Sequence, residues 1–135
     1  MKLPDDSRLL RRALLANAAF STLTGVTLLL VAGPLAPLLG IGALALRITG
    51  ATLLPFAFGL FQNACRPDLR RGEAWLAVGL DLAWVAGSAA LLLGELWPLE
   101  PAGRWAVLGV GDVVLLCAIL QAAGLLREAP RTATR

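Results

Sequence analysis

Histidine is absent from the chain, and cysteine occurs only at Cys65 and Cys117. Haem and zinc sites normally take imidazole or clustered thiolate ligands, so this composition argues against such a site built by the chain alone. The two cysteines form no C-x-x-C pair, whereas membrane thiol oxidoreductases depend on paired cysteines. We therefore expect no metal and no cofactor, and interpret both cysteines as small buried side chains.

Charged residues are also scarce. They make up 16% of the chain, against 58% hydrophobic residues and a mean hydropathy of +0.75. Soluble domains typically carry about 25% charged and roughly 45–50% apolar residues. The net charge of +3 comes from short basic clusters between apolar runs, without a basic face, so we expect no nucleic-acid partner. The composition predicts that the lipid bilayer surrounds the chain.

Four apolar segments are long enough to cross a hydrocarbon layer roughly 30 Å thick, which takes about 20 helical residues. They cover residues 12–33, 41–64, 74–97 and 104–126, and leave a tail at 127–135. Breakers or charges follow them, as in "GPLAP" after the first and "CRPDLRRGE" after the second. Because short connections favour antiparallel neighbours, we predict an all-α integral membrane protein: one domain (1–135), an up-down bundle of four transmembrane helices.

The basic residues predict the orientation of this bundle. All of them except Arg47 and Arg104 lie in the N-terminus, the second connection or the C-terminal tail. By the positive-inside rule, both termini are cytoplasmic. This bias argues against the small multidrug exporters, four-span chains that insert in both directions. The composition, rich in Arg, Ala and Leu, is typical of bacterial proteins, so we expect a multi-pass protein of the bacterial inner (cytoplasmic) membrane.

The tryptophans mark the predicted membrane boundaries. Trp75 and Trp105 open the third and fourth spans, and Trp97 closes the third. An indole at the interface buries its ring and keeps its N–H hydrated, so we interpret these three as interfacial anchors. Trp84 lies deeper in the third span, where either packing or a ligand pocket would account for it.

Two opposite charges fall near the outer side of the spans. Counted at about 1.5 Å per residue, Arg47 and Asp112 both lie about 10 Å below the outer boundary. A charge without a partner there costs several kcal/mol, so such residues normally face the interior and pair. Gly50 lies a turn from Arg47, and Gly109 and Gly111 flank Asp112. We therefore predict an Arg47–Asp112 ion pair that crosses the core.

A second polar layer lies nearer the cytoplasmic side. Asn17, Ser21 and Thr24 share one face of the first span at i, i+4 and i+7. On the third span, four side chains fall within roughly 60° of one direction at 100° per residue. They are Asp81, Trp84, Ser88 and Glu95. We predict that the two stripes form a polar pocket, in which the Asp81 carboxyl is either protonated or reached by water.

The sequence carries no phosphate-binding loop and no paired nucleophile and base, and Asp81 and Asp112 lie near opposite leaflets, so we do not expect an enzyme. An enzyme acting on lipids or isoprenoids is the remaining catalytic alternative. Asp112 and Gln121 lie on opposite sides of the fourth span, so we expect at least one of them to serve a different contact, such as an oligomer or partner surface.

These features predict a non-catalytic accessory or oligomerising subunit of a membrane complex. The alternative is a small transporter, channel or binder of an amphipathic ligand, with its pocket around Asp81. The expected partners are the bilayer, further copies or a larger membrane complex, and a lipid or small amphipathic ligand.

Overall fold

A computed structural model describes residues 5–127 of the chain, with side chains from residue 7 onward, and these residues contain helices and no strand. The helices are α1 (Asp5–Leu39), α2 (Ala43–Cys65), α3 (Arg71–Leu93) and α4 (Pro101–Arg127). Each is long and apolar enough to cross a membrane, which confirms the prediction of helices with four candidate membrane spans. The chain thus has the architecture of a multi-pass membrane protein. The predicted tail beyond residue 127 lies outside the described residues.

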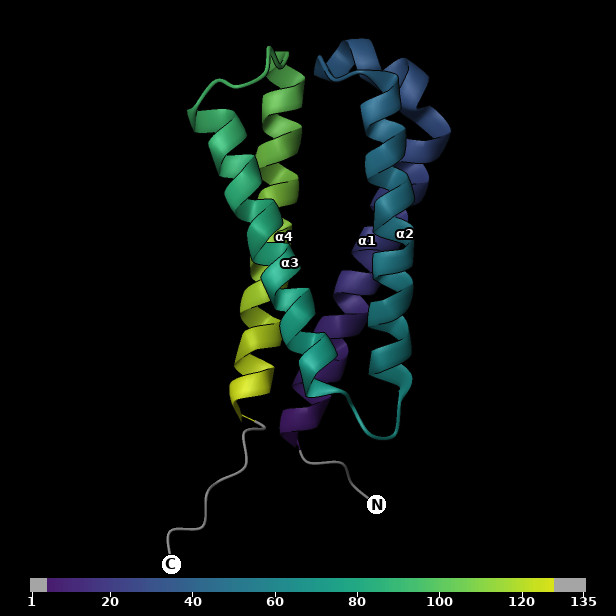
Figure 1. Cartoon of the computed structure of the whole chain (residues 1–135), viewed down its shortest axis with the longest axis vertical. Helices are drawn as coiled ribbons and strands as arrows, with labels where there is room; N and C mark the ends of the chain where they lie inside the picture. The colour runs from purple at the N-terminus through teal and green to yellow at the C-terminus, as the bar shows by residue number, and fades with distance from the viewer. Residues whose placement is uncertain (1–4, 128–135) are drawn as a thin grey trace, which may run out of the picture.

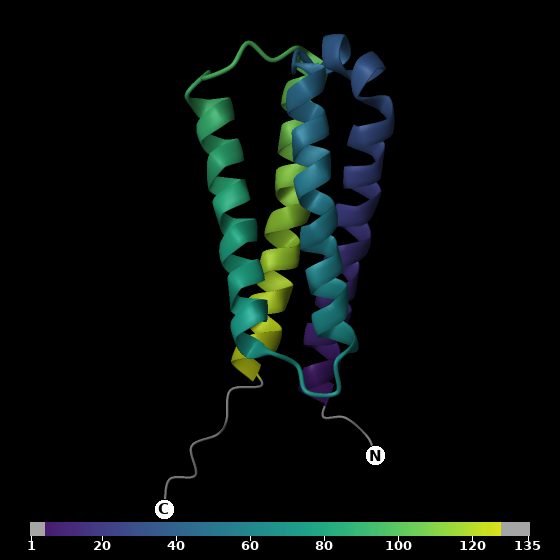
Figure 2. The ribbon, with the colours of Figure 1, turned by 45° about the vertical axis from the view of Figure 1, so that its right-hand side comes forward.

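Successive helices run in opposite directions, and the described chain begins and ends at the same end of the bundle (Figure 1). We call this the termini end, and the end that holds the α1–α2 and α3–α4 connections the opposite end. Helix α1 packs against α2 and α4, and α3 packs against α4, whereas α2 and α3 barely touch. The bundle is therefore two helix pairs, α1 with α2 and α3 with α4, that leave a seam between α2 and α3 (Figures 1 and 2).

Helix α1 bends where the first span was expected to end. Val31 has non-helical angles (φ −117°, ψ 22°), and the chain then continues as helix through Pro34 to Leu39. Pro34 has no N–H to donate to the carbonyl one turn earlier, which permits the bend without ending the helix. Gly40 ends it with a positive φ of 71°, and its N–H donates to the Ala36 carbonyl at 3.0 Å.

The tightly packed core lies in the half of the bundle at the termini end. Its buried apolar members are Leu10, Leu14, Ala18, Leu60, Ala64, Ala74, Ala77, Val78 and Leu125. The members from α3 are Ala74, Ala77 and Val78, two of which are small. The two cysteines separate: Cys117 is buried as expected, whereas Cys65 is exposed.

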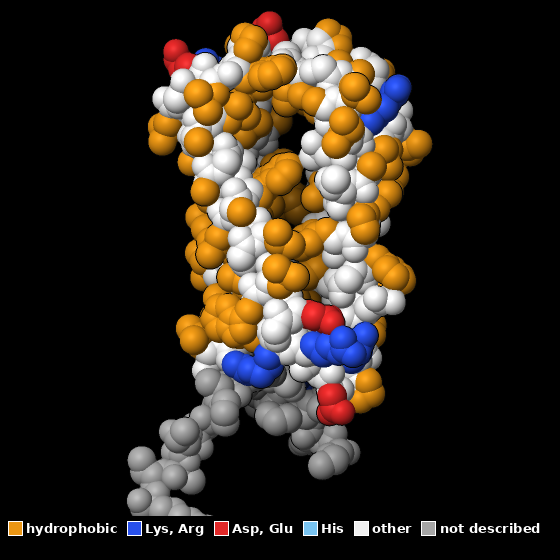
Figure 3. All heavy atoms as spheres, in the orientation of Figure 1, with side chains coloured by type: hydrophobic (Ala, Val, Ile, Leu, Met, Phe, Trp, Pro, Cys, Tyr) orange, Lys and Arg blue, Asp and Glu red, His pale blue; other side chains and the backbone are white. Residues whose placement is uncertain are grey.

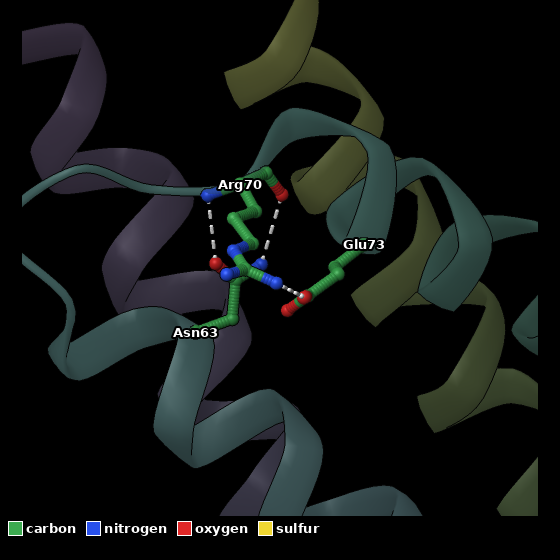
Figure 4. Close-up of polar contacts among 3 residues, drawn as sticks. All are labelled: Asn63, Arg70 and Glu73. Carbon is green, nitrogen blue, oxygen red and sulfur yellow. Dashed lines mark hydrogen bonds and ion pairs between the residues drawn. The ribbon is translucent and has the colours of Figure 1, made fainter.

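The α2–α3 connection is fixed by side chains at the termini end. The buried Asn63 side chain accepts from the Arg70 N–H at 2.8 Å and donates to the Arg70 carbonyl at 3.1 Å. The Arg70 guanidinium pairs with Glu73 at 3.0 Å (Figure 4). On the other side, Arg71 donates to the Leu125 carbonyl at 2.8 Å. These contacts join α2, α3 and α4 at this end.

Substituting Gly50 by alanine should loosen the contact between α1 and α2. An added Cβ would lie 2.7 Å from the Gly25 carbonyl oxygen and 3.1 Å from the Leu28 Cβ, so the helices must separate. We expect a loss of about 1–3 kcal/mol in the free energy of unfolding. Thermal unfolding in mild detergent measures it. Gly59→Ala, on the same helix with nothing within 4 Å of the new Cβ, is the control and should lose no stability.

Candidate functional site

Four buried polar side chains meet where the core ends. Asn17 Nδ2 donates to Asp81 Oδ2 at 2.7 Å, and Gln121 Nε2 donates to the same oxygen at 3.0 Å. Ser21 Oγ donates to Asn17 Oδ1 at 3.2 Å. All four side chains are at most 4% exposed. We call this set, from α1, α3 and α4, the Asp81 cluster.

The four side chains lie together because each continues the buried face of its helix. Asn17 and Ser21 continue the face of α1 that carries the core residues Leu10 and Leu14. Asp81 follows Ala77 on the buried face of α3 one turn later. Because residues three and four apart share a helix face, burying the apolar part of each face brings its polar continuation inside.

The two oxygens of the Asp81 carboxylate differ. Oδ2 accepts both amide donors, whereas no hydrogen bond among the described residues reaches Oδ1, and within this part of the chain Asp81 forms no ion pair. Asp81 also lines a cavity of about 260 Å³. The cluster therefore holds a carboxylate whose second oxygen is left for another donor or a cation.

This cavity leads toward a larger one between the two helix pairs. The larger cavity measures about 600 Å³ and shares Thr24, Leu53, Leu80, Trp84 and Val110 with the smaller one. We call the two together the cleft. Figure 3 shows it as a hollow in the half of the bundle away from the termini, bordered mainly by hydrophobic side chains.

Hydrogen bonds to backbone carbonyls close the cleft at the opposite end. The Glu100 N–H donates to the Leu39 carbonyl at 3.2 Å, and Trp97 Nε1 donates to the Gly40 carbonyl at 3.0 Å. A Cβ on Gly103 would collide with the Leu39 carbonyl, so α4 touches the end of α1 here. At the other end the buried apolar core lies between the cleft and the termini end. The cleft is thus open along the seam between α2 and α3 rather than through either end.

Five of the six predicted pocket residues line this cleft, and Asn17, which lines neither cavity, is joined to it through Asp81. Asn17, Ser21 and Asp81 belong to the cluster, while Thr24, Trp84 and Ser88 line the larger cavity. Gln121 is the member that the sequence did not place in the pocket. Its position opposite Asp112 on the helix was the available signal, because it puts Gln121 on the inner face whenever Asp112 faces outward.

The predicted ion pair between Arg47 and Asp112 does not form. Both side chains are exposed, and they make no ion pair within the described residues. Asp112 lies about three turns into α4 and Arg47 about one turn into α2, on helices that share none of the main packing interfaces. Asp112 therefore does not neutralise Arg47, and its side chain projects outward from the bundle.

The three tryptophans expected as anchors lie at the surface near helix ends. Trp75 and Trp105 lie close to the starts of α3 and α4, and Trp97 lies in the loop after α3, because that helix ends at Leu93. Trp105 is 74% exposed, which suits a ring that lies against lipid.

Comparison of the chain with protein-family models, with curated proteins and with solved structures finds no match in any of the three.

Proposed function

We propose that the protein binds an apolar molecule carrying one polar group, held in the cleft with its polar group at Asp81. The observation that carries this proposal is the junction of a cavity of about 600 Å³ with a smaller one lined by a carboxylate. Ligand sites are typically pockets of about 300–1,000 Å³ with mostly apolar walls and a few polar groups that fix orientation. No reaction is part of the proposal.

The seam between α2 and α3 is the proposed route of entry. We place the protein in the bacterial inner membrane from its composition, and its termini in the cytoplasm from the distribution of its basic residues. In that setting the seam faces the acyl chains, so an apolar molecule enters sideways from the bilayer. The core at the termini end blocks a continuous path along the bundle axis. This favours a binding protein over a channel formed by one copy.

Filling the larger cavity tests this proposal. Gly87 lines it, and nothing lies within 4 Å of a Cβ added there. Gly87→Phe should therefore fold normally and occupy the space. We expect the wild-type protein, purified in mild detergent, to retain an apolar molecule at a fixed stoichiometry by mass spectrometry, and Gly87→Phe to retain none.

The control for this experiment is Gly79→Phe. Gly79 is also an exposed position on α3 with nothing within 4 Å of an added Cβ, but unlike Gly87 it does not line the cleft. It should retain the molecule as the wild type does. If the wild type retains only bulk lipid, or both variants behave alike, the cleft is not a binding site.

A role as an accessory or oligomerising subunit is the second candidate function. The observation in its favour is Asp112, an exposed carboxylate about three turns into a candidate span. A charge facing lipid at that depth costs several kcal/mol, and a protein partner that supplies a donor or a cation would remove this cost. The mass of the complex extracted in mild detergent tests it: a lone single copy would contradict this role.

A further inference from the structure

The charge of the cleft is its most specific property. Among the described residues that line its two cavities, Asp81 is the only charged side chain. Its carboxylate has two neutral amide donors and no cationic partner within this part of the chain. A buried carboxylate is stabilised far more by a cation than by neutral donors, because neutral donors leave its charge uncompensated in an apolar region.

Aromatic rings surround the same position. Phe20, Phe56 and Trp84 line the cavity of about 260 Å³ together with Asp81. Asp81 and Trp84 are three residues apart on α3, so their side chains are neighbours on one helix face. The face of an indole attracts an organic cation, and this attraction is strongest where water is excluded.

We infer that the cleft selects a lipophilic ammonium: an organic cation whose positive group lies at Asp81 Oδ1 beside Trp84, with its apolar part in the larger cavity. This inference rests on the proposed function and names its ligand class. An anion is repelled by the carboxylate. A neutral alcohol donates one hydrogen bond to Oδ1 and supplies no charge, so it gains less than the ammonium does.

A matched pair of probes tests the inference. The full chain is placed in nanodiscs of zwitterionic phospholipid, and binding of dodecylamine and of dodecanol is measured at neutral pH, with empty nanodiscs subtracted. We expect the amine to bind about tenfold to hundredfold more tightly than the alcohol. Asp81→Asn should reduce the amine affinity to about that of the alcohol and change the alcohol affinity far less, because the alcohol loses no ion pair.

The two probes separate failure of the inference from failure of the proposed function. Equal binding of the amine and the alcohol, unaffected by Asp81→Asn, would overturn the selection of a cation while the cleft remains a binding site. Binding of neither probe by the wild type would overturn both.

Trp84 provides a second test that does not disturb the Asp81 cluster, since its side chain takes part in none of the cluster's hydrogen bonds. Trp84→Leu should weaken amine binding about threefold to thirtyfold, and Trp84→Phe by less, because phenylalanine keeps a ring face. Alcohol binding by both variants should equal that of the wild type. If Trp84→Leu weakens both probes equally, the ring acts only by packing and the inference fails.

Discussion

Asn17→Leu is expected to be among the most destabilising single substitutions in the chain. The change removes one of the two amides that donate to Asp81 Oδ2, and the carboxylate stays buried. Removing one partner of a buried charged group typically costs about 3–5 kcal/mol. Ser21 Oγ would also lose its acceptor, Asn17 Oδ1. Chemical unfolding of the purified protein in mild detergent measures the loss.

Removing the carboxylate should reverse most of this loss. In the double variant Asn17→Leu with Asp81→Leu, no buried charge is left without a donor, and Gln121 Nε2 keeps its bond to the Cys117 carbonyl at 3.0 Å. Apolar replacement of a whole buried polar pair is often neutral or stabilising. We therefore expect the double variant to be more stable than Asn17→Leu alone, with a coupling free energy of about 1–3 kcal/mol.

The control for this cycle is Thr27→Val, also on α1. The Thr27 hydroxyl donates only to the Leu23 carbonyl one turn earlier, at an exposed position. Its loss should change stability by less than about 0.5 kcal/mol. If the losses of Asn17→Leu and Asp81→Leu simply add, the two side chains do not interact and the geometry of the Asp81 cluster is wrong.

The Asp81 cluster could be anticipated because helical phase and burial act together. Asn17 and Ser21 share a face of α1 with apolar residues that must be buried, and Asp81 shares a face of α3 with other such residues. A polar layer inside the bundle therefore follows from the spacing alone. Which amides reach the carboxylate could not be anticipated. That depends on the depth of each helix relative to its neighbours, and a shift of one turn replaces one partner by another.

The Arg47–Asp112 prediction failed for this reason. The fourth span was counted from near Trp105, whereas α4 begins at Pro101, which places Asp112 about a turn deeper. The opposite charges of the two residues also do not identify their partners. They indicate that each residue needs a partner, but not that the two residues pair with each other. The seam between α2 and α3 could not be predicted either. It results from close contacts between other helices, such as Gly25 against Gly50.

Arg11→Ala is expected to have the second large effect, through the end of α2. The Arg11 guanidinium donates to the carbonyls of Ala64 at 2.7 Å, Arg66 at 2.5 Å and Pro67 at 2.8 Å. The last carbonyls of a helix have no partner within it, and a cation there also interacts favourably with the helix dipole. Hydrogen bonds from charged groups contribute about 1.5–3 kcal/mol. Losing this set should lower the free energy of unfolding by about 3 kcal/mol.

Arg12→Ala is the matched control, because Arg12 is the adjacent arginine, is exposed, and donates no hydrogen bond within the described residues. It should change stability by less than about 0.5 kcal/mol. Arg11→Lys should fall between the two, since an ammonium lacks the planar fork that reaches several carbonyls at once.

The effect of Arg11 extends to the cleft. The carbonyls that it binds lead into the connection that joins α2 to α3, beside the core at the termini end. Arg11→Ala should therefore also weaken retention of a molecule in the cleft, whereas Arg12→Ala should not. Equal stability and equal retention in the two alanine variants would show that the Arg11 contacts do not hold this end of the bundle together.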